Sequence, residues 1–198
     1  MTTATVRPQF LILHGWQNRR PTGHWEHWLA DRLIAAGHDV SYPQLPEPDL
    51  PVLKDWLAVI EHEITRRPHT EHVVIAHSLS VVAWLHLVDQ GSVHLPVSRA
   101  LLVAPPSPQF LAATSELREF ELPAQFVNLA RASSVTPPRI VCSDNDPYCQ
   151  PPADTIYQGG LDVDRLDGAG HLDMVAGYGP WWSALRWCED PAYRLNAD

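Results

Sequence analysis

The sequence predicts an α/β fold in which a mainly parallel sheet of about six strands, in the order 2-1-3-4-5-6, lies between two layers of helices. Short apolar runs alternate with longer amphipathic stretches along the whole chain, and this alternation requires parallel pairing through right-handed crossovers. Several runs are apolar at nearly every position, as expected of strands covered on both faces. The 198 residues contain no repeat and no linker, so we expect one domain over residues 1–198 without a large lid.

The expected elements follow from apolar spacing and from turn residues. Strands are predicted at residues 10–13, 38–42, 72–76, 100–104, 139–143 and 161–166. Helices are predicted at residues 24–36, 49–66, 79–89, 150–158 and 180–186. Gly37 and Gly91 are natural helix stops, and Pro180 suits the first position of the last helix. Residues 107–138 have poorer periodicity and several prolines, so short helices and loop are expected there. This is the one segment that could form a partial cap, and the sequence leaves that role open.

Composition and charge narrow the classes of partner. The formal net charge is −9, and such an acidic chain repels phosphate backbones and anionic lipid heads. No apolar run approaches the roughly 20 residues of a membrane-spanning helix. The cysteines, Cys142, Cys149 and Cys188, are few and odd in number, which argues against a disulfide scaffold and for a reducing compartment. We therefore expect a cytoplasmic protein that binds neither nucleic acid nor membranes.

The run from residue 72 to residue 80, HVVIAHSLS, has the pattern of a nucleophile elbow. A strand ends, Ser78 follows, and a helix begins at once. Such a turn brings the residues two before and two after the serine almost into contact, so both must be small. Ala76 and Ser80 satisfy this requirement, although glycine is usual at these positions. A serine that only caps the helix explains the same nine residues equally well.

Two later loops supply the partners that a nucleophilic serine needs. A hydroxyl becomes reactive when a histidine, oriented by a carboxylate, removes its proton. The acid candidates, Asp144 and Asp146, follow the fifth strand, and the base candidate, His171, follows the sixth. This order of serine, acid and histidine is that of α/β-hydrolases. Turn-forming aspartates and a surface histidine are the alternatives, but they do not explain why all three residues follow strand ends in this order.

The oxyanion hole is expected between the first and third strands. Its donors would be the backbone N–H groups of Leu79, directly after the serine, and of Trp16, in the loop after the first strand. Both loops meet at the topological switch point of the predicted sheet. The substrate pocket is expected to include five further residues, namely His14, Gly15, Gln17, His77 and Trp181.

These residues together resemble the YdeN-like and retinoblastoma-binding-protein-9-like small serine hydrolases, a lidless branch of the α/β-hydrolase superfamily. The resemblance rests on residues 11–16, 24–29, 73–80, 101–106, 141–149 and 168–181. It implies Ser78 as nucleophile, His171 as base and Asp146, the aspartate directly before proline, as acid. Ser80 departs from the family pattern, which has glycine at this position.

The sequence thus predicts a serine hydrolase that cleaves small ester or amide substrates through an acyl-serine intermediate and needs no cofactor. A shallow, open site would favour short substrates over long lipids. No metal site is expected, because His24 and His27 lie at helical spacing without a third ligand nearby in the sequence. Two alternatives remain: a non-catalytic or weakly active binding protein on the same scaffold, and a thiol enzyme that uses Cys149.

Overall fold

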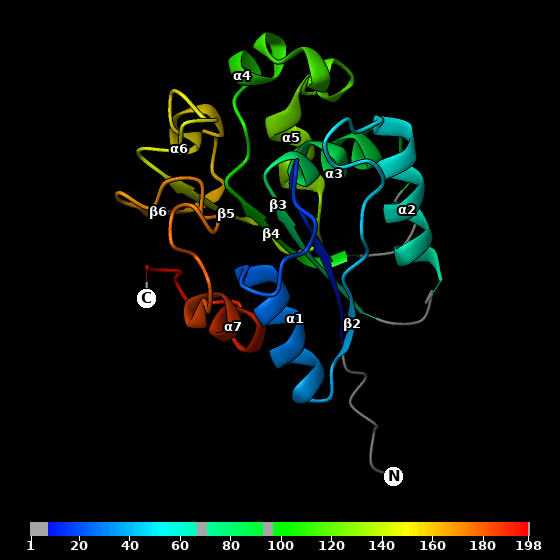
Figure 1. Cartoon of the computed structure of the whole chain (residues 1–198), viewed down its shortest axis with the longest axis vertical. Coiled ribbons are helices and arrows are strands. Elements are labelled where there is room, and N and C mark those ends of the chain that lie inside the picture. The colour runs from blue at the N-terminus through cyan, green and yellow to red at the C-terminus, as the bar shows by residue number, and fades with distance from the viewer. Residues whose placement is uncertain (1–7, 67–70, 93–96, 198) are drawn as a thin grey trace.

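The sheet of the protein has six strands, all of them paired in parallel (Figure 1). The structure is a computed structural model that describes residues 8–66, 71–92 and 97–197. Its strands are β1 (Gln9–Leu13), β2 (Asp39–Ser41), β3 (His72–His77), β4 (Val97–Val103), β5 (Arg139–Ser143) and β6 (Asp162–Leu166). They lie in the order β2-β1-β3-β4-β5-β6, which confirms the predicted order.

Helices connect successive strands. They are α1 (Trp25–Ala35), α2 (Leu53–Thr65), α3 (Leu79–Asp89), α4 (Pro108–Ala113), the 3-10 helix η1 (Ser115–Phe120), α5 (Phe126–Ala132), α6 (Ala153–Ile156) and α7 (Trp182–Glu189). Four helix starts differ from the expected residues 24, 49, 150 and 180, because α1, α2, α6 and α7 begin at Trp25, Leu53, Ala153 and Trp182. The α2 helix begins after Val52, because the residue before Pro51 is disfavoured in the helical conformation. The α7 helix has Trp181 as its N-cap, so Pro180 lies before the helix and not at its first position.

The two faces of the sheet have separate apolar cores. Along β1, Phe10 and Ile12 belong to the core under α1 and α7, whereas Leu11 and Leu13 belong to the core under α2 and α3. Figure 1 shows α1 and α7 on one side of the strands and α2 and α3 on the other. This alternation is what a strand buried on both faces requires, and it confirms the predicted three layers.

The carboxyl ends of the strands carry the loops of the candidate site. The β1 and β3 strands are neighbours whose connections leave in opposite directions, toward β2 on one side and toward β4 on the other. Such a switch point places a crevice at the strand ends. The segment that could form a partial cap contains α4, η1 and α5 and lies at the top of Figure 1. No helix of the described residues is long and apolar enough to cross a membrane.

Candidate active site

The turn between β3 and α3 holds Ser78 in a strained conformation. Its backbone has φ 57° and ψ −122°, a combination that non-glycine residues rarely adopt and that surrounding structure must enforce. The Ser78 N–H donates to Val103 O at 2.8 Å, which fixes the turn to the end of β4. The side chain is therefore presented beyond the strand ends, as the elbow pattern predicts.

Ser80 fits the elbow through its hydroxyl group. The Ser80 Oγ lies 2.8 Å from Leu13 O and accepts a hydrogen bond from His77 N at 3.0 Å. The side chain is fully buried, as is Ala76 on the other side of the turn. The hydroxyl thus links the ends of β1 and β3, and the turn keeps its sharp form.

His171 lies between Ser78 and Asp146. Its Nε2 is 2.8 Å from Ser78 Oγ, and its Nδ1 is 2.9 and 3.0 Å from the two carboxylate oxygens of Asp146. Because a carboxylate only accepts, the Nδ1 carries the proton and the Nε2 presents its lone pair to the serine hydroxyl. All three side chains are more than nine-tenths buried. This tautomer and orientation are those that a general base requires.

The loops after β5 and β6 are joined residue by residue. Asp144 Oδ1 accepts from Gly168 N at 2.7 Å, Ser143 Oγ accepts from Ala169 N at 2.9 Å, and Asn145 Oδ1 accepts from Gly170 N at 2.7 Å. The residues that follow these two segments are Asp146 and His171, which are themselves in hydrogen-bond contact. Asp144 is thereby assigned to holding the loop, and the Gly168 bond keeps the pKa of Asp144 below its ordinary value.

The loop after β1 passes directly beside the serine. A Cβ on Gly15 would lie 2.8 Å from Ser78 Cβ, a separation that real side chains do not tolerate, so the close approach requires glycine. The Gln17 N–H donates to Pro48 O at 2.9 Å, and this hydrogen bond anchors the far end of the turn. The intervening Trp16 and the first residue of α3, Leu79, both line the cavity at Ser78.

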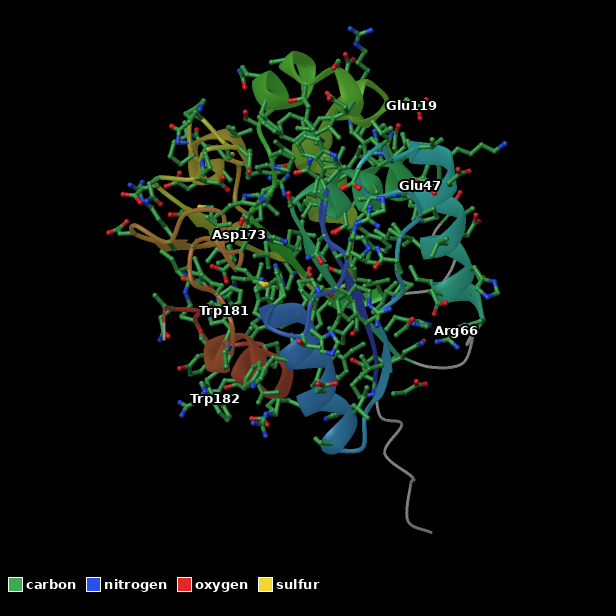
Figure 2. The ribbon with its side chains drawn as sticks, in the orientation of Figure 1. Glu47, Arg66, Glu119, Asp173, Trp181 and Trp182 are labelled. Atoms are coloured by element: carbon green, nitrogen blue, oxygen red, sulfur yellow. The ribbon has the colours of Figure 1, made fainter. Side chains whose placement is uncertain are left out.

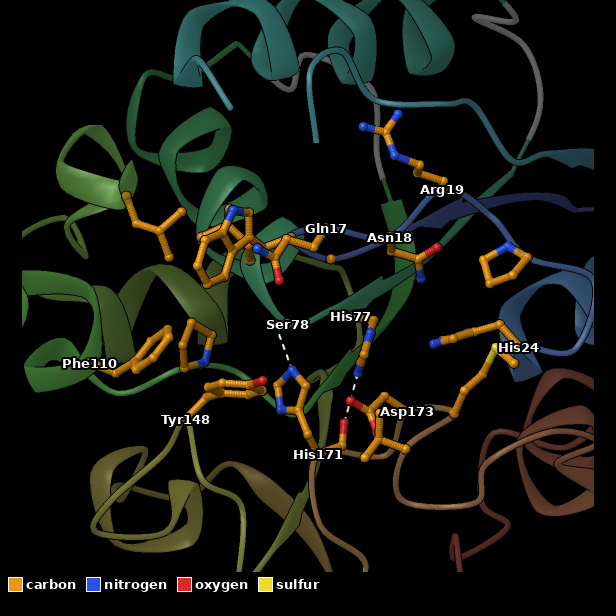
Figure 3. Close-up of a pocket in the computed structure, with 18 residues that line it drawn as sticks. Gln17, Asn18, Arg19, His24, His77, Ser78, Phe110, Tyr148, His171 and Asp173 are labelled. Carbon is orange, nitrogen blue, oxygen red and sulfur yellow. Dashed lines mark hydrogen bonds between the residues drawn. The ribbon is translucent and has the colours of Figure 1, made fainter. Parts of the chain in front are cut away.

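A cavity of about 400 Å³ opens over Ser78. Figure 3 shows Phe110 and Tyr148 on one side of Ser78, and Asn18 and Asp173 on the other. Of the pocket residues expected from sequence, three line this cavity, namely Gly15, Gln17 and His77. Lining residues that the sequence reasoning did not assign to the pocket include Asn18, Phe110, Leu117, Tyr148, Asp173, Met174 and Val175.

Two expected pocket residues do not line the cavity. His14 is fully buried, where its Nε2 accepts from Leu45 N at 2.8 Å and its Nδ1 donates to Gly15 O at 2.8 Å. Burial lowers the pKa of His14 to about 4, so the ring is a neutral structural element. Trp181 lies in the core against Trp25, with ring centroids 5.1 Å apart. Both expectations were wrong for the same reason: the side chain of a residue beside a loop can point into the protein core instead of into the cavity.

The paired Trp182 also lies away from the cavity. It packs against Trp28 of α1, with ring centroids 5.0 Å apart, and Figure 2 shows Trp181 and Trp182 beside α7. Two residues that line the cavity, His24 and His77, form a buried polar group together with Glu26. The His77 Nε2 donates to the carbonyl of His171 at 3.0 Å. His77 therefore contacts the loop after β6, which carries His171.

Comparisons with known proteins place the chain in a family. A family model described as serine hydrolase matches residues 10–188. The YdeN protein of Bacillus subtilis (strain 168) is 30% identical over 99 residues, which are 48% of this chain and 50% of that protein. The match thus spans about half the length of this curated relative.

Two solved structures share the fold. The crystal structure of the ydeN gene product from Bacillus subtilis has a TM-score of 0.71 at 23% identity and covers 90% of this chain and 95% of that one. A YdeN-like protein from Pectobacterium atrosepticum has a TM-score of 0.67 at 23% identity and covers 92% of this chain and 90% of that one. The family match over residues 10–188 shows that the chain belongs to this serine hydrolase family, and the two solved structures show that it shares their fold.

Proposed function

We propose that this hydrolase cleaves small carboxylic ester or amide substrates through an acyl-serine intermediate, with Ser78 as nucleophile, His171 as base and Asp146 as orienting acid. The observation that carries the proposal is the continuous contact from Ser78 Oγ through the ring of His171 to Asp146, at 2.8 and 2.9 Å. Because the carboxylate of Asp146 only accepts hydrogen bonds, it fixes the proton of His171 on Nδ1. The lone pair of Nε2 can then remove the proton of Ser78 Oγ.

Acylation follows from these positions. As Ser78 Oγ forms a bond with the substrate carbonyl carbon, His171 Nε2 takes the hydroxyl proton, and the carbonyl oxygen becomes an oxyanion. When the carbonyl re-forms, the bond to the leaving group breaks, and the imidazolium of His171 gives its proton to that group. Deacylation repeats the sequence with water: the base takes a water proton, the water oxygen attacks the acyl carbon, and Ser78 leaves with the returned proton.

The oxyanion is assigned to two backbone N–H groups, those of Leu79 and Trp16. Leu79 is the first residue of α3, so its N–H has no acceptor within the helix and is free to donate. Trp16 follows Gly15, whose Cα approaches Ser78 so closely that a side chain would clash. Donors fixed in advance beside the developing charge stabilise it without reorganisation.

The cavity supports small substrates with an apolar acyl group. Its volume of about 400 Å³ lies in the lower part of the usual range for ligand pockets. Trp16, Phe110 and Tyr148 form an aromatic wall on the side of α4, and the Phe110 and Tyr148 ring centroids are 4.9 Å apart. We assign the acyl group to this wall and the leaving group to the polar side at Asn18 and Asp173.

The two competing functions have weaker support. Cys149 is buried, and burial raises the pKa of its thiol to about 12, which disfavours the thiolate that a cysteine enzyme needs. A non-catalytic binding protein drew its support from Ser80 in place of glycine. The hydroxyl of Ser80 is accommodated by hydrogen bonds within the elbow, and this favours a functional nucleophile.

Labelling by a fluorophosphonate probe tests the nucleophile directly. Wild-type protein is expected to bind one probe at Ser78, and the Ser78→Ala variant none. Ser115→Ala is the matched control, because Ser115 is an exposed serine outside the cavity, and it is expected to label like wild type. Labelling that persists in Ser78→Ala would contradict the assignment.

The acyl preference is tested with p-nitrophenyl esters of increasing chain length and with aminoacyl amides. We expect kcat/KM to be highest for short acyl groups and to fall for long chains. Phe110→Ala is expected to reduce kcat/KM for butyrate more than for acetate, because the larger acyl group loses more contact with the wall. Equal reductions for both esters would contradict the placement of the acyl group.

A further inference from the structure

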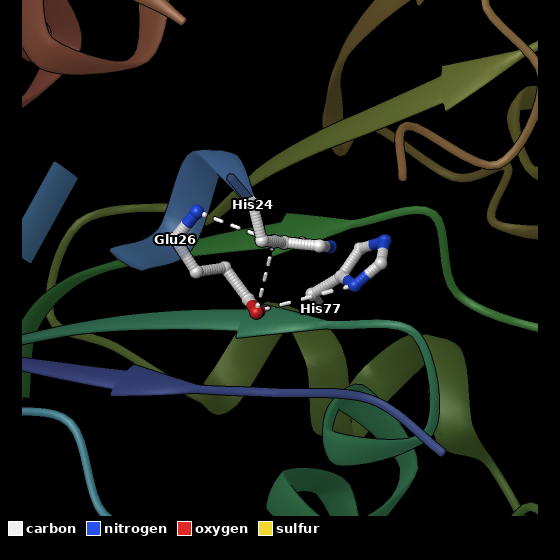
Figure 4. A group of neighbouring side chains, drawn as sticks. All are labelled: His24, Glu26 and His77. Atoms are coloured by element: carbon white, nitrogen blue, oxygen red, sulfur yellow. Dashed lines mark hydrogen bonds and ion pairs between the residues drawn. The ribbon is translucent and has the colours of Figure 1, made fainter. Parts of the chain in front are cut away.

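His24, Glu26 and His77 form a buried polar group in the wall of the cavity (Figure 4). His24 and Glu26 come from the beginning of α1, and His77 is the last residue of β3. One ligand atom from each residue lies within 4.8 Å of the others. All three side chains are at least nine-tenths buried, so each polar atom needs a partner inside the protein.

The hydrogen bonds of Glu26 leave one carboxylate oxygen without a donor. Its Oε2 accepts from Tyr42 Oη and from Asn18 Nδ2, both at 3.0 Å. Its Oε1 is buried and has no hydrogen-bond partner among the described residues. The carboxylate is therefore oriented through one oxygen and presents the other to His77.

His77 presents a lone pair to that same oxygen. Because its Nε2 carries the proton donated to His171 O, the Nδ1 of the neutral ring is an acceptor. This Nδ1 is buried and has no hydrogen-bond partner in the described part of the chain, and it lies 3.9 Å from Glu26 Oε1. Two electron-rich atoms thus face each other across a gap with no proton donor between them.

His24 adds a third lone pair. Its Nδ1 accepts a long hydrogen bond of 3.3 Å from Glu26 N and lies 3.3 Å from Glu26 Oε2. The amide contact shows that the proton of the neutral ring is on Nε2. The Nδ1 lone pair makes only this long bond, which a bound cation would replace. Acceptor atoms of two imidazoles and one carboxylate therefore lie within 4.8 Å of one another.

The width of the gap distinguishes a shared proton from a metal ion. A proton between His77 Nδ1 and Glu26 Oε1 would need them at most about 3.2 Å apart, and they are 3.9 Å apart. A zinc ion with bonds of about 2.0–2.2 Å joins atoms about 3.4 Å apart in tetrahedral geometry and up to about 4.2 Å apart in a line. The 3.9 Å between His77 Nδ1 and Glu26 Oε1 lies within this range.

We propose that His24, Glu26 and His77 bind one divalent cation of the zinc class. Two histidines and one glutamate are a ligand set that zinc prefers, and a water molecule completes the tetrahedron. His24 and His77 line the cavity, so the ion would enter the site from the cavity side. The surrounding bonds are those that support metal ligands: a backbone carbonyl holds the other nitrogen of His77, and two donors hold the other oxygen of Glu26.

The site explains the burial of an uncompensated carboxylate. Glu26 Oε1 is buried and lacks a compensating partner among the described residues. A bound cation supplies that partner and joins the start of α1 to the end of β3. Through His77 it also supports the loop of His171. The ion is a structural element here, and its binding does not depend on hydrolytic activity.

The sequence spacing pointed to a different pair. His24 and His27 are one helical turn apart, but His27 Nδ1 donates to Arg20 O at 3.0 Å and its ring lies beside Asp31. His27 is thus a histidine of the same helix that takes no part in the group. This makes it the matched control for the experiment.

Isothermal titration calorimetry with Zn²⁺ on untagged, EDTA-treated and dialysed protein tests the proposal. We expect one ion per chain, and an affinity at least about 100-fold lower in His24→Asn and in Glu26→Gln. The asparagine keeps an N-cap acceptor for Glu26 N, so that variant retains the start of α1. His27→Asn and Ser78→Ala are expected to bind like wild type. Co²⁺ in place of Zn²⁺ is expected to give the visible absorption of a tetrahedral site.

Thermal unfolding supplies a second readout. Zn²⁺ is expected to raise the Tm of wild type and of His27→Asn, because it binds only the folded state, and to leave the Tm of His24→Asn unchanged. Three results would overturn the proposal: no saturable binding by wild type, binding that persists in both ligand variants, or binding that is lost in Ser78→Ala and so belongs to the serine site.

Discussion

Replacing Gly15 with alanine is expected to impair the oxyanion hole while leaving the fold intact. The new Cβ would lie 2.8 Å from Ser78 Cβ and 3.3 Å from both Ser78 Oγ and His77 O. Ordinary contacts begin at 3.4 Å, so the loop or the elbow must move by about 0.6 Å. Gly15 is not among the residues with positive φ. The clash, and not the backbone conformation, is therefore the cause of the effect.

The size of the effect follows from what the loop carries. Trp16 is the next residue, and its N–H is the proposed second oxyanion donor. Loss of one such donor lowers kcat by about 100- to 1,000-fold, and a displacement near 1 Å costs about 100-fold. We expect kcat for a short ester to fall about 100-fold and KM to change less than about threefold. The free energy of unfolding is expected to decrease by about 1–3 kcal/mol.

Steady-state hydrolysis of p-nitrophenyl acetate and thermal unfolding measure both effects. Gly179→Ala is the matched control, because its Cβ would meet Gly23 O at an ordinary 3.4 Å; it should keep both kcat and Tm. A Gly15→Ala enzyme with kcat within about threefold of wild type would refute the reasoning, since the loop would then tolerate the side chain without loss of the donor.

Four further substitutions probe other parts of the molecule. Asp146→Asn is expected to lower kcat about 10⁴-fold, because the amide no longer fixes the tautomer of His171. Asp144→Asn keeps an oxygen that accepts from the loop, so its kcat should stay within about tenfold of wild type. Equal losses of kcat in ester hydrolysis would contradict the assignment of Asp146 as the acid. Ser80→Ala removes a buried acceptor and should lower the free energy of unfolding in urea by about 1–3 kcal/mol; an unchanged midpoint would contradict this. The pKa of His14 lies at about 4 in the folded protein against an ordinary 6.5. Its contribution to stability is therefore complete above pH 6.5 and is lost as the pH falls toward 4, by up to about 3 kcal/mol. His14→Gln should flatten the urea-measured stability between pH 7 and 4, and an unchanged slope would disprove the linkage.

The sequence allowed the sheet to be predicted because its signals are local. Each of the six apolar runs became a strand, and the β5 bounds agreed to the residue. Boundaries were wrong where a neighbour in space extends an element. β4 begins at Val97, three residues before the predicted start, because Val97 pairs with His72 of β3. That pairing has no signal in the residues that surround Val97.

The proposed triad could also be predicted from the sequence, because strand ends converge at one edge of a parallel sheet. The bonds that join residues 143–145 to residues 168–170 could not, since they depend on how two loops from adjacent strands face each other. The aromatic wall was likewise missed. Phe110 belongs to a segment without clear periodicity, and its position depends on how α4 packs over the strand ends.

The sequence by itself determined the order of elements, the elbow at Ser78 and the placement of Asp146 and His171 after their strands, because periodicity and turn chemistry act over a few residues. Only the tertiary structure decided which loop residues face the cavity and which face the core. Trp181 turned inward because α7 crosses beside α1, and His77 met His24 and Glu26 because β3 ends beside the start of α1. Whether a side chain is buried, and where its lone pair points, depend on packing between segments that are distant in the sequence. The spacing of residues along the chain does not specify that packing.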